Sequence, residues 1–315
     1  RVLLVRLNER LDGALDTALA MFDDTYPRPF FHQLVSSQLD MDRLDYLRRD
    51  SFYTGVAEGE VGVQRLLKTM RVHPLQGGPA SEVMIEAKGI YAVENFLISR
   101  RLMYWQVYLH KTVLAGDELL RGVLRRVQEH LDAGPPPDWL ARGSRALLFF
   151  LRHDIRADQI DDPTVRDHYV QLDDTDILFS LKQWMQGPDP ILADLCRRFV
   201  NRRFLRVTFV PRSPDAAQME QWRAQVADWL VAEGLAARTD ASDAARHYLT
   251  ANVSRHTAYD SDQELIGILG RNGTVQELSE MADTATISEL TGFVEKPYVC
   301  FPKPVDLDVA ALAEE

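Results

Sequence analysis

Cysteine is nearly absent from the sequence. The 315 residues contain two, Cys196 and Cys300, which excludes a cysteine metal cluster, disfavours a disulfide framework and fits a reducing compartment. No apolar run approaches the roughly 20 residues that a membrane-spanning helix needs. The first residues, 1–8, are too few and too soon charged for a signal peptide. We therefore expect a cytoplasmic protein without membrane contact.

Positive charge is also scarce. Lys and Arg number 36 against 47 Asp and Glu, which gives a net charge of -11. Proteins that coat nucleic acid depend on cationic side chains that release counterions from phosphates, so nucleic acid is an allowed but not a favoured partner. A phosphate ligand would need a local basic pocket. The chain is nevertheless 46% hydrophobic, enough for a sizeable core, and its length suggests about two domains.

Apolar residues recur at helical spacing through the first two thirds of the chain. The pattern predicts an amphipathic helix over residues 1–23, a short helix over 59–70 and a long helix from 81 to about 115. The Pro- and Gly-rich residues 73–79 predict a loop between the last two. Further helices are predicted over residues 117–131, 138–152, 175–186 and 189–201.

The pattern changes after residue 206. It predicts strands and one amphipathic helix, over residues 207–210, 214–233 (the helix), 247–256, 265–269 and 298–301, with a turn at Asn272 and Gly273. We therefore expect a mainly α protein. Residues 1–206 would form a helical domain, and residues 207–315 a smaller C-terminal α+β domain.

Residues 36–55 are the most informative stretch. Around a helix, one face carries Met41, Leu44, Leu47 and Ser51, and the other carries Asp42, Arg43, Asp45, Tyr46, Arg49 and Asp50. Asp40 can accept hydrogen bonds from the free amides of the first turn, and Gly55 can end the helix. The polar face is either a solvated charged surface or, because it mixes carboxylates, guanidinium and phenol, the wall of a polar pocket.

This stretch resembles the D-x-D-[RK]-[LMW]-D-Y-x-x-R-D signature of the HD-domain phosphohydrolases, and within them of the deoxynucleoside triphosphate (dNTP) triphosphohydrolases. The similarity continues through residues 62–72 and 88–96, Arg100 and residues 108–111. A linked series with matching gaps is more specific than any single motif. The resemblance covers roughly residues 1–206 and implies an HD-type helical domain.

The resemblance implies a divalent metal, which could be Mn, Mg, Fe or Zn. Asp42 stands at the position of the family's later metal-binding aspartate, and this is the catalytic role that the resemblance gives it. Such a metal lowers the pKa of bound water and offsets charge on phosphate oxygens. The alternative interpretation of Asp42 is a capping or salt-bridged surface acid.

The resemblance also implies substrate contacts and an enzyme that cuts dNTPs into deoxynucleoside and triphosphate. Arg43, Tyr46 and Arg100 match positions that bind the triphosphate, and Arg suits this role because its planar fork can donate two parallel hydrogen bonds. Asp50 matches the acid that accepts from the sugar 3′-hydroxyl, and Tyr108 matches the ring that excludes a 2′-hydroxyl. For the two tyrosines, ordinary core packing is the alternative.

The family's earlier metal ligands, a histidine followed by H-D-x-x-H-x-P-F-x-H, have no match here. Before the signature this sequence offers only His32, and His153-Asp154 follows it without the remaining motif, so we interpret that pair as structural. A lone aspartate holds a transition metal poorly. The sequence also begins with Arg1. We expect that the N-terminal part of the protein is missing here and that this chain alone is inactive.

A basic segment at residues 197–206 suggests regulation. In related enzymes a similar stretch, together with two earlier basic positions, helps to bind activator nucleotides between subunits. The resemblance thus implies Arg65, Lys88, Arg202 and Arg206 as regulatory ligands and a homo-oligomer. A solvated hinge is the alternative for the segment. A second hypothesis for the function is a regulatory or assembly module that binds nucleotides or nucleic acid without chemistry.

Overall fold

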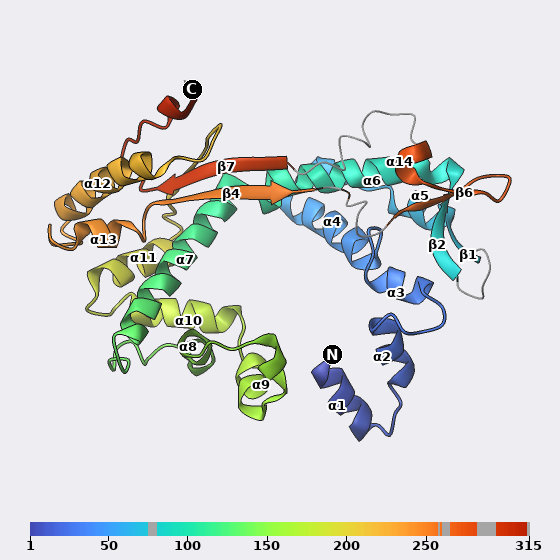
Figure 1. The fold of residues 1–315 in the computed structure, drawn as a ribbon, viewed down its shortest axis with the longest axis horizontal. Coiled ribbons are helices and arrows are strands. Elements are labelled where there is room, and N and C mark those ends of the chain that lie inside the picture. Colours follow the sequence, from blue (N-terminus) through green and yellow to red (C-terminus); the bar gives the residue numbers. More distant parts are fainter. Residues whose placement is uncertain (75–80, 258, 260–264, 282–293, 314–315) are drawn as a thin grey trace. The chain divides into compact units, whose positions relative to one another are not determined.

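The computed structural model describes residues 1–74, 81–257, 259, 265–281 and 294–313. The fold is mainly α with a smaller α+β part, which confirms the predicted class (Figure 1). The chain forms two compact units, each of two segments. The first unit comprises residues 1–110 and 255–295, and the second comprises 111–254 and 296–315. The expected boundary between residues 206 and 207 does not coincide with this division and stays a prediction.

The first unit combines helices with a small sheet. Its elements are α1 (Val2–Arg10), α2 (Asp16–Phe22), α3 (Phe30–Val35), α4 (Met41–Thr54), η1 (Ala57–Gly59), α5 (Val63–Thr69), β1 (Met70–Pro74), β2 (Ser81–Glu86), η2 (Ala87–Gly89), α6 (Ile90–Met103), the π-helix η3 (Tyr104–Tyr108), β5 (Gly267–Leu269), β6 (Val275–Glu277) and α14 (Leu278–Met281). Its core includes Leu47, Leu66, Phe96, Met103 and Ile268, none of them exposed.

The prediction of one helix from residue 81 to about 115 is wrong. Residues 81–86 form β2, which pairs antiparallel with β1 and parallel with β5, in a sheet of order β1-β2-β5-β6. Met84 and Ile85 are buried in this sheet. Pairing with residues almost 200 positions away therefore overrides the local helical preference. The loop predicted at 73–79 lies mostly outside the described residues, and its first two residues belong to β1.

The prediction of one helix over residues 1–23 is also wrong, because a turn separates α1 from α2. Asp12 and Gly13 have positive φ angles of 51° and 84°, which an α-helix does not allow. The Asn8 side chain accepts from the Leu15 amide at 2.6 Å and donates to Asp16 at 2.7 Å. Local side-chain hydrogen bonds thus end the first helix.

The second unit is built on the long helix α7. Its elements are α7 (Lys111–Asp132), α8 (Arg145–Arg152), η4 (Ala157–Asp161), α9 (Pro163–Tyr169), α10 (Asp174–Trp184), α11 (Pro190–Val200), β3 (Arg206–Phe209), α12 (Ala216–Ala232), α13 (Ala241–Ala245) and η5 (Ala310–Ala313). Strands β4 (Thr250–His256) and β7 (Val294–Phe301) contribute residues to both units and complete the sheet β3-β7-β4. Within the described residues, no helix has the length and apolar character to cross a membrane.

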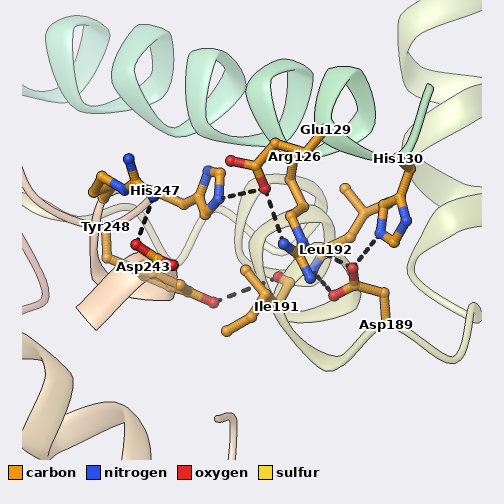
Figure 2. Close-up of polar contacts among 10 residues, drawn as sticks. Arg126, Glu129, His130, Asp189, Ile191, Leu192, Asp243, His247 and Tyr248 are labelled. Atoms are coloured by element: carbon orange, nitrogen blue, oxygen red, sulfur yellow. Dashed lines mark hydrogen bonds and ion pairs between the residues drawn. The ribbon is translucent and has the colours of Figure 1, made fainter. Parts of the chain in front are cut away.

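A polar network joins α7 to α11 in the second unit (Figure 2). Asp189 caps α11 by accepting from the Leu192 amide at 3.0 Å, and its other oxygen accepts from Arg126 Nε at 2.8 Å. His130 Nε2 contacts the same oxygen. Burial opposes ionisation of Asp189, but the bonds from the amide, the imidazole and the guanidinium outweigh it and lower its pKa. Asp189 therefore stays charged and paired inside the unit.

Candidate functional site

Helix α4 has the boundaries that its sequence predicts. The Asp40 carboxylate accepts from the Arg43 amide at 2.7 Å, and Gly55 ends the helix in the left-handed conformation with φ of 73°. Leu44 and Leu47 are buried on the apolar face. The opposite face carries the exposed Asp42, Asp45 and Arg49, whereas Tyr46 is partly buried and packs against the same core.

Two of the predicted substrate residues are hydrogen-bonded to each other. The Tyr108 hydroxyl donates to Asp50 Oδ2 at 2.7 Å, which links the π-helix η3 to α4. The Tyr46 and Tyr108 rings meet edge to face, with centroids 6.0 Å apart. Residues 58 positions apart in the sequence are thus brought together. Their role in substrate binding stays a prediction.

The π-helix places a second tyrosine in the same cluster. The Leu109 amide donates to the Tyr104 carbonyl at 2.7 Å, five residues earlier, which is the π-helical spacing. Tyr104 lies edge to face with Tyr108 at 5.0 Å and stacks on His256 at 3.6 Å. We call Tyr46, Tyr104, Tyr108 and His256 the aromatic cluster. Single π-helical turns of this kind often occur at functional sites.

Basic groups lie beside the aromatic cluster. The Arg100 guanidinium donates to Gln38 Oε1 at 3.3 Å, and its central carbon lies 6.0 Å from the Tyr104 ring centre. Arg43 forms a 3.1 Å ion pair with the N-cap Asp40. Both arginines lower the pKa of Tyr46. The first unit therefore gathers Arg100, Arg43 and three phenols around one side of α4.

The phenols of Tyr46 and Tyr108 remain protonated at neutral pH. Burial and the neighbouring Tyr104 hydroxyl raise the pKa of Tyr46 to about 12, against the effect of Arg100 and Arg43. Burial, followed by the hydrogen bond to Asp50, raises the pKa of Tyr108. Protonated hydroxyls can donate hydrogen bonds to phosphate or sugar oxygens.

Asp42 lies on the exposed side of α4. Across the residues that the structure describes, no three His, Cys, Asp or Glu side chains gather so that they could hold a metal ion. His153 is exposed at the end of α8, with Nδ1 2.8 Å from the Phe149 carbonyl, which agrees with its structural interpretation. One carboxylate does not make a site for a transition metal, so these residues do not fit a metal by themselves.

Two residues of the aromatic cluster were not predicted as site residues. A sequence pattern could have pointed to Tyr104, because it lies four residues after Arg100 and four before Tyr108, on the same face of a predicted helix. No sequence pattern pointed to His256. Its partner Tyr104 is about 150 positions away, and an isolated histidine in a strand pattern is more often a core residue.

The four residues predicted for regulation fall in both units. Arg65 donates to the Lys88 carbonyl at 3.0 Å, and Lys88 pairs with Glu86 in the first unit. A surface hollow there is lined by Glu86, Ala87, Lys88, Leu269, Gly270 and Arg271. Arg202 and Arg206 belong to the second unit, where they lie over the rings of Phe204 and Phe301. Their regulatory role stays a prediction.

Residues 61–136 match the protein family described as HD associated region. The chain is 31% identical over 277 residues to the uncharacterized protein YwfO of Bacillus subtilis, covering 85% of this chain and 56% of that protein. An uncharacterized protein of Methanocaldococcus jannaschii is 37% identical over 122 residues, which is 38% of this chain and 26% of that protein. The chain thus spans only part of these relatives, about half of YwfO.

Two solved structures are similar to the chain. The crystal structure of a phosphohydrolase from Bacteroides thetaiotaomicron has a TM-score of 0.82 and 38% identity, covering 96% of this chain and 71% of that one. The crystal structure of a hypothetical protein from Aquifex aeolicus has a TM-score of 0.60 and 17% identity, covering 98% of this chain and 68% of that one. The second likeness concerns the fold alone.

Proposed function

The chain belongs to the HD-domain phosphohydrolases, and from this premise we propose that the whole protein is a metal-dependent dNTP triphosphohydrolase. It would convert a dNTP and water into a deoxynucleoside and triphosphate. This chain would contribute the side of the site that binds the sugar and the phosphates. HD phosphohydrolases generally use divalent metals, and Asp42 would be one ligand among others.

One observation carries the proposal, the 2.7 Å hydrogen bond from Tyr108 to Asp50. A carboxylate has about four acceptor positions, so Asp50 can hold Tyr108 and also accept from a sugar hydroxyl. The bond would in turn fix the Tyr108 ring against the sugar. A fixed ring discriminates by steric exclusion, because a 2′-hydroxyl would have to displace it. This arrangement supports a deoxyribose ligand.

The charge distribution supports a polyphosphate beside that sugar. Arg100 and Arg43 supply cationic donors near Tyr46, and the phenol donates without adding negative charge, because its pKa is about 12. Donors fixed before the substrate arrives stabilise anionic oxygens without a reorganisation cost. The net charge of -11 makes such a local positive region necessary for a triphosphate.

The proposal is tested with the full-length protein and a panel of dNTPs in the presence of Mn²⁺ or Mg²⁺. We expect release of triphosphate, and a loss of at least about 10³-fold in Asp42→Ala, in the range for a group that binds the catalytic metal. Asp45→Ala is the matched control, because Asp45 is exposed on the same helix and pairs only with Arg49 in the described part. It should remain active. No triphosphate from any nucleotide would contradict the proposal.

A nucleotide-binding module without chemistry is the second candidate. It is favoured by the exposed Asp42 and by the absence of a metal-ligand cluster in the described part of the chain. Calorimetry with dGTP and with single-stranded DNA separates the two candidates. Binding of dGTP without turnover in the full-length protein would favour the module.

A further inference from the structure

His256 stacks on Tyr104, beside the side chains that we propose bind the substrate. It ends strand β4, and the residue is 8% exposed. The imidazole stacks on Tyr104 with ring centres 3.6 Å apart and an angle of 11° between the planes. Trp105 meets its edge at 6.4 Å. The flat face of the imidazole thus supports the ring of Tyr104, the first residue of the π-helix.

The His256 imidazole is uncharged at neutral pH. Burial, followed by the charges of Arg100 and Arg101, lowers the pKa of His256 to about 4. A protonated imidazole would repel Arg100, whereas a neutral one lets the guanidinium remain at the Tyr104 ring. Among the described residues, Nε2 has no hydrogen-bond partner. The contact of His256 with Tyr104 is made by the face of its ring.

The stacking of His256 on Tyr104 connects, through further contacts, to the predicted sugar-binding residues Tyr108 and Asp50. Tyr104 touches Tyr108 edge to face at 5.0 Å, and Tyr108 holds Asp50. Tyr104 also contacts the Tyr46 hydroxyl, as its effect on the pKa of Tyr46 indicates. If the Tyr104 ring lost its support, it could turn into the space behind it. The edges that position Tyr46 and Tyr108 would then move.

We propose that His256 is a positioning residue for nucleotide binding, which fixes Tyr104 and through it Tyr46, Tyr108 and Asp50. His256 itself does not touch the substrate. This inference rests on the proposed function for the identity of the ligand. The positioning itself can be measured without a ligand.

The test uses the full-length protein and the variants His256→Ala and His256→Phe. We expect His256→Ala to weaken binding of fluorescent mant-dGTP about tenfold, since small misplacements of a binding wall are costly. His256→Phe retains a flat, neutral ring and should restore affinity to within about twofold. Ile268→Val is the matched control. It removes a methyl group from the core of the same unit and should lower thermal stability without changing affinity.

Hydrogen exchange of residues 100–110 provides the ligand-free measurement. His256→Ala should speed exchange in this segment, whereas His256→Phe and Ile268→Val should leave it near the wild-type rate. Unchanged exchange in His256→Ala, or equal effects in His256→Ala and Ile268→Val, would overturn the inference. If the wild type binds no nucleotide, the proposed function fails, and the exchange data alone decide whether His256 positions Tyr104.

Discussion

At the scale of the residue, the hydrogen bond between Tyr108 and Asp50 joins two residues that the sequence predicts for sugar binding. The motif resemblance selected both residues, and the structure brings their side chains to 2.7 Å. Local rules also predicted that Asp40 caps helix α4 and that Gly55 ends it. They could not find His256, because a stacking contact between distant residues leaves no periodic trace. The role of a side chain that acts through tertiary contacts cannot be predicted from a local sequence pattern.

The buried imidazole makes a prediction about stability and pH. The pKa of His256 falls from 6.5 to about 4 on folding, so between these values the unfolded chain binds a proton that the folded chain does not. The contribution of the neutral His256 imidazole to the free energy of unfolding is fully present above pH 6.5. It decreases as the pH falls toward 4, by up to about 3 kcal/mol. The groups that face the imidazole are Arg100 and Arg101 from α6 and the rings of Tyr104 and Trp105.

Urea unfolding at pH 7 and pH 4.5 checks this prediction. His256→Phe should lose less stability between the two values than the wild type does. The other buried histidine with a lowered pKa, His247, is present in both proteins, so its contribution cancels. An identical decrease in both proteins would show that position 256 does not carry the effect.

At the scale of the element, amphipathic helices were predictable and strand pairs were not. Helices α10, α11 and α12 lie close to their predicted positions, because each carries a helical apolar pattern. Residues 81–86 carry a composition that favours helix, yet they form β2 between β1 and β5. Hydrogen bonds and burial supplied by β5 exist only in the folded chain. The π-helix η3 is equally hidden, since its sequence continues that of α6.

The start of α11 makes a prediction for the second unit (Figure 2). Asp189→Ala removes the N-cap and the partner of Arg126 and His130. Arg126 is only half-buried and keeps its 2.9 Å ion pair with Glu129, so the change removes the N-cap and one charged hydrogen-bond partner. It should lower the free energy of unfolding by about 2–3 kcal/mol. Thermal or chemical unfolding measures the loss. Asp243→Ala, which breaks the exposed pair with Arg246, is the control and should cost less than about 1 kcal/mol.

At the scale of the whole molecule, the fold class was predictable and the division into units was not. Each compact unit contains two separate stretches of the sequence, and no change of composition along the chain marks such an arrangement. The predicted substrate residues all belong to the first unit, although α6 and η3 are followed directly by α7 of the second. The homo-oligomer stays a prediction, which size-exclusion chromatography with light scattering can check.

The discrimination between deoxyribose and ribose tests the account most directly. The measurement is the ratio of kcat/KM for dGTP to that for GTP in the full-length protein, for the wild type and for Tyr108→Ala. We predict a strong preference for dGTP in the wild type and a ratio at least about tenfold smaller in Tyr108→Ala, because the ring that excludes the 2′-hydroxyl is gone. Equal ratios in the two proteins would contradict the claim that Tyr108 and Asp50 bind the sugar.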